Sequence, residues 1–166
     1  LCLALPGLSL FDPQRFALDL LNVILGEGMS SRLFIEIRDK RGLAYSIGSY
    51  VDHLLDSGAM TVYAGVEPKN LPVTVQAILE QLALLKEPIP ETELLKAKEL
   101  IKGRMLLRME DTRDVSGWMG GQEVLTGRIR SVDQVAGIVD AVTGEPLADA
   151  ESIIQIFAIA ECHGTF

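Results

Sequence analysis

The stretch LGEGMSSRLFIEIRDKRGLAYS, residues 25–46, places a glycine-rich turn, a short helix and the start of a strand in one compact unit. Gly26 and Gly28 supply the backbone freedom that is needed where an apolar helix ends and the chain turns. Gly42 ends the next helix, which we expect over residues 30–41. No other part of the sequence groups residues that could contact a substrate so closely.

The helix predicted over residues 30–41 has an apolar side and a charged side. Ser30 or Ser31 can cap its first turn, and Glu36 and Lys40 form a favourable pair four residues apart. Its expected buried residues are Leu33, Phe34 and Ile37, and the positive charges that complement the dipole at its C-terminus are Arg38, Lys40 and Arg41.

Hydrophobic patterning along the rest of the chain predicts an α+β domain. Alternating and β-branched residues predict strands at 1–5, 43–52, 59–66 and 156–161, with a hairpin between the second and third. Apolar residues at helical spacing predict helices at 12–26, 71–86, 91–110, 112–127 and 131–143. Because helices and strands do not alternate as in a parallel fold, we expect an antiparallel or mixed β-sheet covered on one face by helices.

Particular residues predict where some of these helices begin. Asp12 and Asn70 are each expected to cap the helix that follows them. Ser131 and Gln134 have the spacing of a capping box, in which each side chain bonds the other residue's backbone N–H. A last helical turn is expected to start at 143–146.

The two motifs GEGMSSRLF and RDKRGLAYS resemble the C-terminal half of the insulinase/pitrilysin-type zinc peptidases, most closely the branch of the mitochondrial processing peptidases and their bacterial relatives. Members of this family are built from paired, similar α+β halves, with an H-x-x-E-H zinc motif in the N-terminal half and an arginine–tyrosine pair in the C-terminal half. The resemblance implies that residues 1–166 form a single C-terminal half-domain of this fold. Because the chain opens at Leu1 in an apolar stretch without a methionine, we expect it to be a piece of a longer polypeptide.

The resemblance assigns the catalytic arginine–tyrosine pair to Arg38 and Tyr45, which are seven residues apart. In peptide hydrolysis by zinc the carbonyl oxygen gains negative charge, and donors aimed at that oxygen stabilise the transition state. On the residues alone, two structural interpretations stay open. Arg38 can be a charge that complements a helix end, and Tyr45 can be a strand residue packed beside Leu43 and Ile47.

The resemblance also implies that Gly26 and Gly28 bind substrate, since a glycine-containing loop near the peptide entrance offers bare backbone to an extended chain. The structural alternative is a turn between two helices, which the residues alone favour. A phosphate-binding loop is not indicated, because no Gly-Lys-Ser/Thr sequence follows.

No metal site is predicted within this chain. A catalytic zinc needs about three protein ligands, and neither His53 nor His163 begins an H-x-x-E-H or H-E-x-x-H motif. Cys2 and Cys162 are remote from both histidines. We expect His53 to be exposed near the hairpin loop, and the resemblance places the Zn cofactor in a separate N-terminal half.

Composition limits the remaining possibilities. The length of 166 residues suits one domain, and 48% hydrophobic with 23% charged residues is typical of a folded globular protein. The net charge of −8 argues against nucleic-acid binding. The sequence has no run of 18 or more apolar residues, so no membrane span is indicated. Two cysteines fit buried thiols in a reducing compartment, so we expect a cytoplasmic location.

The resemblance implies that the chain is the substrate-binding and transition-state-stabilising half of a zinc-dependent endopeptidase that acts on extended peptides. Its expected partners are the peptide substrate and a zinc-bearing N-terminal half or partner subunit, in a homo- or heterodimer. This half alone is expected to be inactive. Two alternatives stay open: a non-catalytic partner or scaffold subunit of the same family, and an unrelated α+β ligand-binding module.

Overall fold

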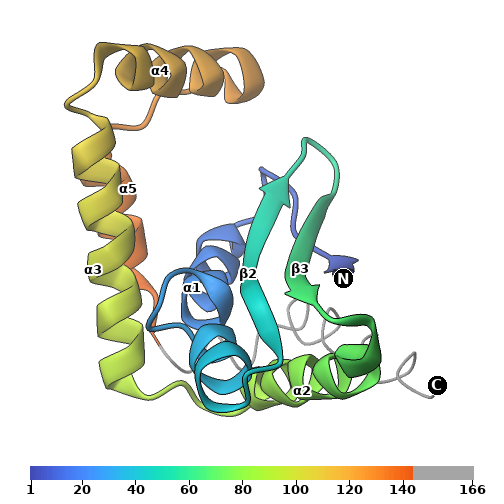
Figure 1. The fold of residues 1–166 in the computed structure, drawn as a ribbon. Helices are drawn as coiled ribbons and strands as arrows, with labels where there is room; N and C mark the ends of the chain where they lie inside the picture. The colour runs from blue at the N-terminus through green and yellow to red at the C-terminus, as the bar shows by residue number, and fades with distance from the viewer. Residues whose placement is uncertain (144–166) are drawn as a thin grey trace.

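A three-stranded antiparallel sheet forms the centre of the computed structural model, which describes residues 1–143 (Figure 1). The strands are β1 (Cys2–Pro6), β2 (Ala44–His53) and β3 (Gly58–Val66), arranged in the order β1-β3-β2. Strands β2 and β3 form the predicted hairpin, and β1 pairs with the other edge of β3. The α+β class is confirmed, and within the described residues the sheet takes the antiparallel form. The strand predicted at 156–161 and most of the turn at 143–146 lie outside the described residues.

Helices surround one face and one end of this sheet. Figure 1 shows α1 beside β2, α3 and α5 side by side beyond α1, α2 across the end of the hairpin, and α4 projecting from the far end of α3. None of the helices within residues 1–143 is long and apolar enough to cross a membrane. The helical elements are α1 (Arg15–Gly26), the π-helix η1 (Phe34–Lys40), η2 (Pro68–Asn70), α2 (Leu71–Ala83), η3 (Leu84–Lys86), α3 (Glu91–Arg108), α4 (Thr112–Thr126) and α5 (Val132–Ala141).

The core lies between one face of the sheet and α1. Side chains of a strand alternate between the two faces of a sheet, so one face can be buried while the other is exposed. The inward face of the sheet is apolar, whereas on the outward face Tyr50 and Tyr63 each keep 45% of their surface exposed. A half-covered antiparallel sheet is expected to show this contrast. The buried residues that make up the contact are Leu5, Ile47, Met60, Val62 and Ala64 from the strands and Leu18, Leu20, Leu21 and Leu25 from α1.

The predicted element ends are partly confirmed. Ser131 and Gln134 form the complete capping box at the start of α5, and Gly42 adopts a φ of 61° after η1. Asp12 accepts a hydrogen bond from the Gln14 N–H at 2.8 Å, but α1 begins only at Arg15.

Two local predictions are wrong. The Asn70 side chain forms no capping hydrogen bond, because the 3-10 turn η2 runs directly into α2 and already orders the backbone there. Cys2 is exposed rather than buried. Its register partner is Tyr63, so Cys2 lies on the outward face of the sheet.

Candidate functional site

Arg38 lies on a helix that departs from α geometry. Residues 34–40 form the π-helix η1, whose wider turns shift the residues that follow to a new side of the helix. Leu33 and Ile37 are fully buried and hold this segment against the core, as predicted. Arg38, the residue after Ile37, is exposed.

Tyr45 lies at an irregularity of the neighbouring strand. Ala44 pairs with Val66 and Ser46 pairs with Gly65, so Tyr45 is the extra residue of a β-bulge. Bulges change the direction of a side chain and are frequent beside active sites. The Tyr45 side chain keeps 86% of its surface exposed, so the interpretation of Tyr45 as a packed strand residue is wrong.

These two irregularities bring Arg38 and Tyr45 together. The Arg38 guanidinium carbon lies 4.6 Å from the centre of the Phe34 ring and 6.0 Å from the centre of the Tyr45 ring. Arginine over an aromatic face is a favourable contact that limits the freedom of the guanidinium. Arg38 also sits in the last turn of η1, where it complements the helix dipole. The dipole interpretation and the substrate interpretation of Arg38 are therefore compatible.

Gly26 and Gly28 occupy different environments. Gly26 is buried at the end of α1, and a Cβ atom there would lie 2.6 Å from the Ser49 backbone N. Gly28 is exposed and has a φ of 91°, and a Cβ atom added to it would meet no other atom within 4 Å. Gly26 thus has a packing role that the sequence did not indicate, whereas Gly28 forms an accessible turn.

The turn after Gly28 is held by a hydrogen bond that differs from the predicted one. The Ser31 hydroxyl donates to the Gly28 carbonyl at 2.7 Å. Neither Ser30 nor Ser31 caps the following helix with its side chain, since Leu33 is the N-cap residue and the Ser31 hydroxyl is used in this turn. The glycine turn is therefore tied to the start of the helix that carries Arg38.

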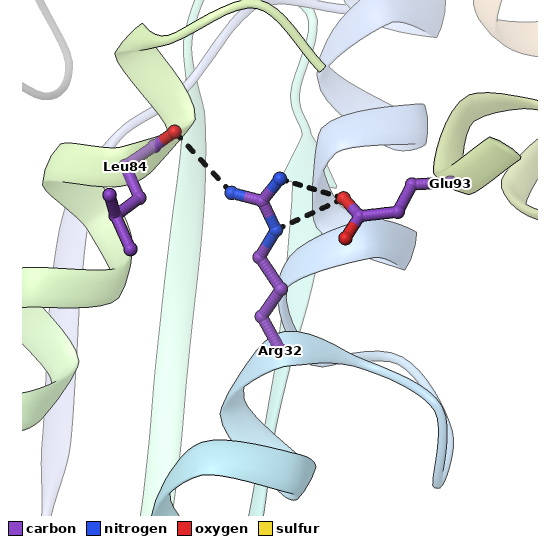
Figure 2. A network of polar contacts seen from close by, with 3 residues as sticks. All are labelled: Arg32, Leu84 and Glu93. Carbon is purple, nitrogen blue, oxygen red and sulfur yellow. Dashed lines mark hydrogen bonds and ion pairs between the residues drawn. The ribbon is translucent and has the colours of Figure 1, made fainter. Parts of the chain in front are cut away.

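Arg32 connects this helix to two distant elements (Figure 2). Its Nε and Nη2 donate to one carboxylate oxygen of Glu93 at 3.1 and 2.7 Å, and its Nη1 donates to the Leu84 carbonyl at 3.3 Å. The Arg32 side chain is 17% exposed, whereas its partner Glu93 is 38% exposed, so the ion pair is only partly shielded from solvent. The network fixes the start of the Arg38 helix against η3 and α3. Sequence reasoning missed it, because Arg32 and Glu93 are 61 positions apart.

The prediction that His53 is exposed is wrong. Its side chain is 13% exposed, and both ring nitrogens lie near acceptors: Nδ1 is 2.6 Å from the Leu8 carbonyl and Nε2 is 3.1 Å from the Asp19 carboxylate. Burial opposes the charged ring, but the hydrogen bonds to Asp19 and Leu8 outweigh it and raise the pKa of His53. Two acceptors favour the doubly protonated ring.

His53 thus has a structural role, and the other described side chains do not complete a metal site around it. Residues 1–143 contain no group of three or more His, Cys, Asp or Glu side chains arranged to hold a metal ion. His163 and Cys162 lie outside the described residues.

The exposed cluster of Arg38 and Tyr45 can donate hydrogen bonds. The guanidinium offers several N–H groups and the phenol offers one O–H, and both suit a carbonyl or carboxylate oxygen. The cluster is therefore equipped to bind and to stabilise negative charge.

Comparison with known proteins identifies the relatives of this chain. Residues 1–101 match the family model described as the peptidase M16 inactive domain. The chain is 38% identical over 146 residues to the uncharacterized zinc protease YmxG of Bacillus subtilis, an alignment that covers 87% of this chain and 36% of that protein. It is 40% identical over 133 residues to an uncharacterized zinc protease of Mycobacterium leprae, covering 80% of this chain and 30% of that protein.

Solved structures agree with this relationship. A protease from Helicobacter pylori superposes with a TM-score of 0.83 at 25% identity, covering 94% of this chain and 38% of the other. The peptidase M16 inactive domain from Pseudomonas fluorescens superposes with a TM-score of 0.81 at 25% identity, covering 91% of this chain and 36% of the other. The chain thus spans about a third of the length of the relatives that it matches. On this family match, the sequence identity and the shared fold, the chain belongs to the inactive-domain family of the M16 zinc peptidases.

Proposed function

We propose that this chain is the substrate-binding and transition-state-stabilising half of a zinc-dependent endopeptidase that acts on extended peptides. The zinc and the base that hydrolysis requires would be supplied by a separate N-terminal half or partner subunit, in a homo- or heterodimer. The observation that supports the proposal best is the exposed contact between Arg38 and Tyr45, whose ring centre lies 6.0 Å from the guanidinium carbon.

The geometry of the two side chains is suited to this role. Arg38 and Tyr45 come from different elements, and each is turned outward by a backbone irregularity, the π-helix and the β-bulge. Irregularities of both kinds are frequent at functional sites. The ring of Phe34 supports the guanidinium from one side. Donors that are positioned before substrate binds need little reorganisation as charge develops on the substrate oxygen.

Of the two predicted glycines, Gly28 fits the proposed substrate contact better. Its backbone is exposed, and its φ of 91° favours glycine, which has no side chain to cover the backbone. Gly26 contributes by letting α1 end close against Ser49, which positions the turn. We therefore propose that an extended peptide contacts the backbone of Gly28 as well as Arg38 and Tyr45.

The decisive experiment is Arg38→Ala in the complete, zinc-containing protein, assayed with an unfolded peptide substrate. Loss of one transition-state donor lowers kcat by about 10²–10³-fold in well-studied enzymes, and we expect a loss of that order. Tyr45→Phe removes only the hydroxyl and should lower kcat without changing the fold.

A matched control is Arg41→Ala. Arg41 is an exposed arginine close to Arg38 in sequence, but it pairs with Glu80 on α2 at 3.0 Å. Its loss should leave kcat within about twofold of the unchanged protein, because surface ion pairs contribute little. If Arg38→Ala turned over substrate as fast as Arg41→Ala, the proposed role of Arg38 would be wrong.

The scaffold alternative is separated by the same assay. One structural neighbour is Complex III2 from Candida albicans, with a TM-score of 0.79 at 19% identity, which shows a shared fold. A scaffold subunit would not need an exposed arginine and tyrosine in contact. Absence of turnover by the unchanged complete protein would favour the scaffold role.

A further inference from the structure

A second candidate site lies away from Arg38 and Tyr45, in a cavity between α1, the distal half of β2, and helices α3, α4 and α5. We refer to it as the inter-helix cavity; its volume is about 730 Å³. Its walls are mainly apolar. The apolar side chains that line it include Phe16, Val23, Ile101, Met105, Val135 and Val139. A mostly apolar cavity with a few polar groups is typical of ligand sites.

The charged side chains that line the inter-helix cavity carry more positive than negative charge. Arg15, Arg104 and Arg108 line it, against the carboxylates of Asp19 and Glu27. Both carboxylates are already engaged: Asp19 with His53 at 3.1 Å, and Glu27 with Arg104. A basic cavity is unusual in a chain of net charge −8.

Of the three arginines in the lining, Arg104 and Arg108 form ion pairs with Glu27 and Asp114, whereas Arg15 forms none within residues 1–143. Its Nη1 donates to the Leu10 carbonyl at 2.5 Å and its guanidinium lies 4.6 Å over the Phe16 ring, but it forms no ion pair with any residue in the described part of the chain. Burial, followed by the nearby positive charge of Arg130, lowers the pKa of Arg15 below its usual value, although the negative charge of Asp19 opposes them in part. An anion beside this guanidinium would offset both effects.

We infer that the inter-helix cavity binds an apolar carboxylate, with the carboxylate at Arg15 and the apolar body against Phe16 and Ile101. The walls favour an apolar body, and a single guanidinium that has no ion pair within residues 1–143 favours a monoanion over a phosphate, which needs several donors. We assign the carboxylate to the C-terminal end of an apolar peptide. That choice of carrier rests on the proposed function, whereas the anion site itself does not.

The chain contains a built-in reporter for this site. Trp118 is the only tryptophan among the 166 residues, and it lines the cavity from α4. Its fluorescence in the purified chain can be followed during titration with decanoate, kept below its micelle concentration, and with decanol as the neutral analogue. Decanoate and decanol form the first ligand pair. The second pair is a short N-acetylated apolar peptide with a free C-terminal carboxylate and the same peptide with a C-terminal amide.

We expect a saturable change in Trp118 emission with the carboxylate of each pair, and binding at least about tenfold weaker for its neutral analogue, as a charge-assisted hydrogen bond implies. Binding of decanoate but not of the peptide would support the site and replace the peptide by a fatty acid as the carrier. Equal binding of decanoate and decanol, or no saturable change with either, would overturn the inference.

Variants test the residue assignment. Arg15→Gln keeps a polar side chain but removes the charge, so it should weaken carboxylate binding by about tenfold or more. Arg41→Gln, an arginine paired with Glu80 outside the cavity, is the matched control and should bind like the unchanged chain. Carboxylate affinity unchanged in a folded Arg15→Gln would overturn the assignment.

Ile101→Phe provides an independent variant that leaves every charge in place. It fills part of the apolar wall and should weaken decanoate and decanol alike. If Arg15→Gln does not fold, as judged by circular dichroism, the comparison of acid with neutral ligand in Ile101→Phe and in the unchanged chain still decides. Since these readouts are binding and not turnover, their failure is distinct from failure of the proposed peptidase role.

Discussion

Gly26 packs so closely on β2 that a methyl group has no room. A Cβ atom at this position would overlap the Ser49 hydroxyl and would lie 2.6 Å from the Ser49 backbone N. The Ser49 hydroxyl is in turn bonded to the Asn22 side chain at 2.7 Å, so it is not free to move away. We expect Gly26→Ala to lower the free energy of unfolding by about 1–3 kcal/mol, the usual cost of overpacking, measured by urea denaturation.

The control for this substitution is Gly120→Ala. Gly120 lies within α4, and a Cβ atom there would have no neighbour within 4 Å. Because alanine favours a helix by about 1 kcal/mol over glycine, this variant should be neutral or slightly stabilising. Equal destabilisation by both substitutions would contradict the packing role of Gly26.

His53 makes the stability of the chain depend on pH. Its pKa is raised above the ordinary value of 6.5 by hydrogen bonds to Asp19 and Leu8 that outweigh burial, although the charge of Arg15 opposes them. A raised pKa in the folded state stabilises the fold fully below the unfolded pKa, and this contribution is lost as pH rises through the folded pKa. His53→Gln should therefore lose more unfolding free energy at about pH 5 than at about pH 9.

The measurement is urea unfolding of both proteins at the two pH values. Subtracting the variant from the parent at each pH removes the contributions of the other titrating groups. A difference that is larger at the higher pH would mean that His53 is held neutral.

At the scale of single elements, the capping box of α5 can be tested alone. Ser131 accepts from the Gln134 N–H at 3.2 Å, and Gln134 accepts from the Ser131 N–H at 2.9 Å. Ser131→Ala should lower the free energy of unfolding by about 1 kcal/mol, the typical value of an N-cap. Ser116→Ala, at an exposed serine in α4, should change it by less than about 0.5 kcal/mol. Both values come from denaturant titration.

The elements that sequence reasoning predicted well depend on nearby residues. The capping box spans only residues 131–134, and Gly42 ends η1 through its own φ of 61°. The features that were not predicted from the sequence depend on residues that are distant along the chain. The π-helix and the bulge at Tyr45 arise from how η1 and β2 fit the core, and His53 meets a carbonyl 45 positions away.

The candidate site was predicted only in part for the same reason. The motif placed Arg38 and Tyr45 at the end of a helix and the start of a strand, but seven residues of spacing do not say whether two side chains face each other. The contact between them, and the difference between buried Gly26 and exposed Gly28, required the three-dimensional arrangement.

At the scale of the whole molecule, this chain should not respond to zinc. The described residues contain no cluster of three metal ligands, and the proposal places the zinc in another half. Addition of Zn²⁺ or EDTA should therefore leave the thermal unfolding midpoint unchanged, whereas a site at about a hundred times its Kd would add about 2.7 kcal/mol. A zinc-dependent rise in the midpoint would show that the chain binds the metal itself.

The π-helix makes segment length more important than segment composition around the site. A π turn holds about one residue more than an α turn, so a single deletion within residues 34–37 should convert η1 to an ordinary turn. A deletion of this kind removes the wide turn that directs Arg38, and an insertion, for which the turn has no room, would rotate every side chain beyond it by about 100°, one step of an α-helix. Insertions and deletions there are thus expected to be far more damaging than exchanges of exposed side chains, which gives protein engineers a rule for where this scaffold tolerates redesign.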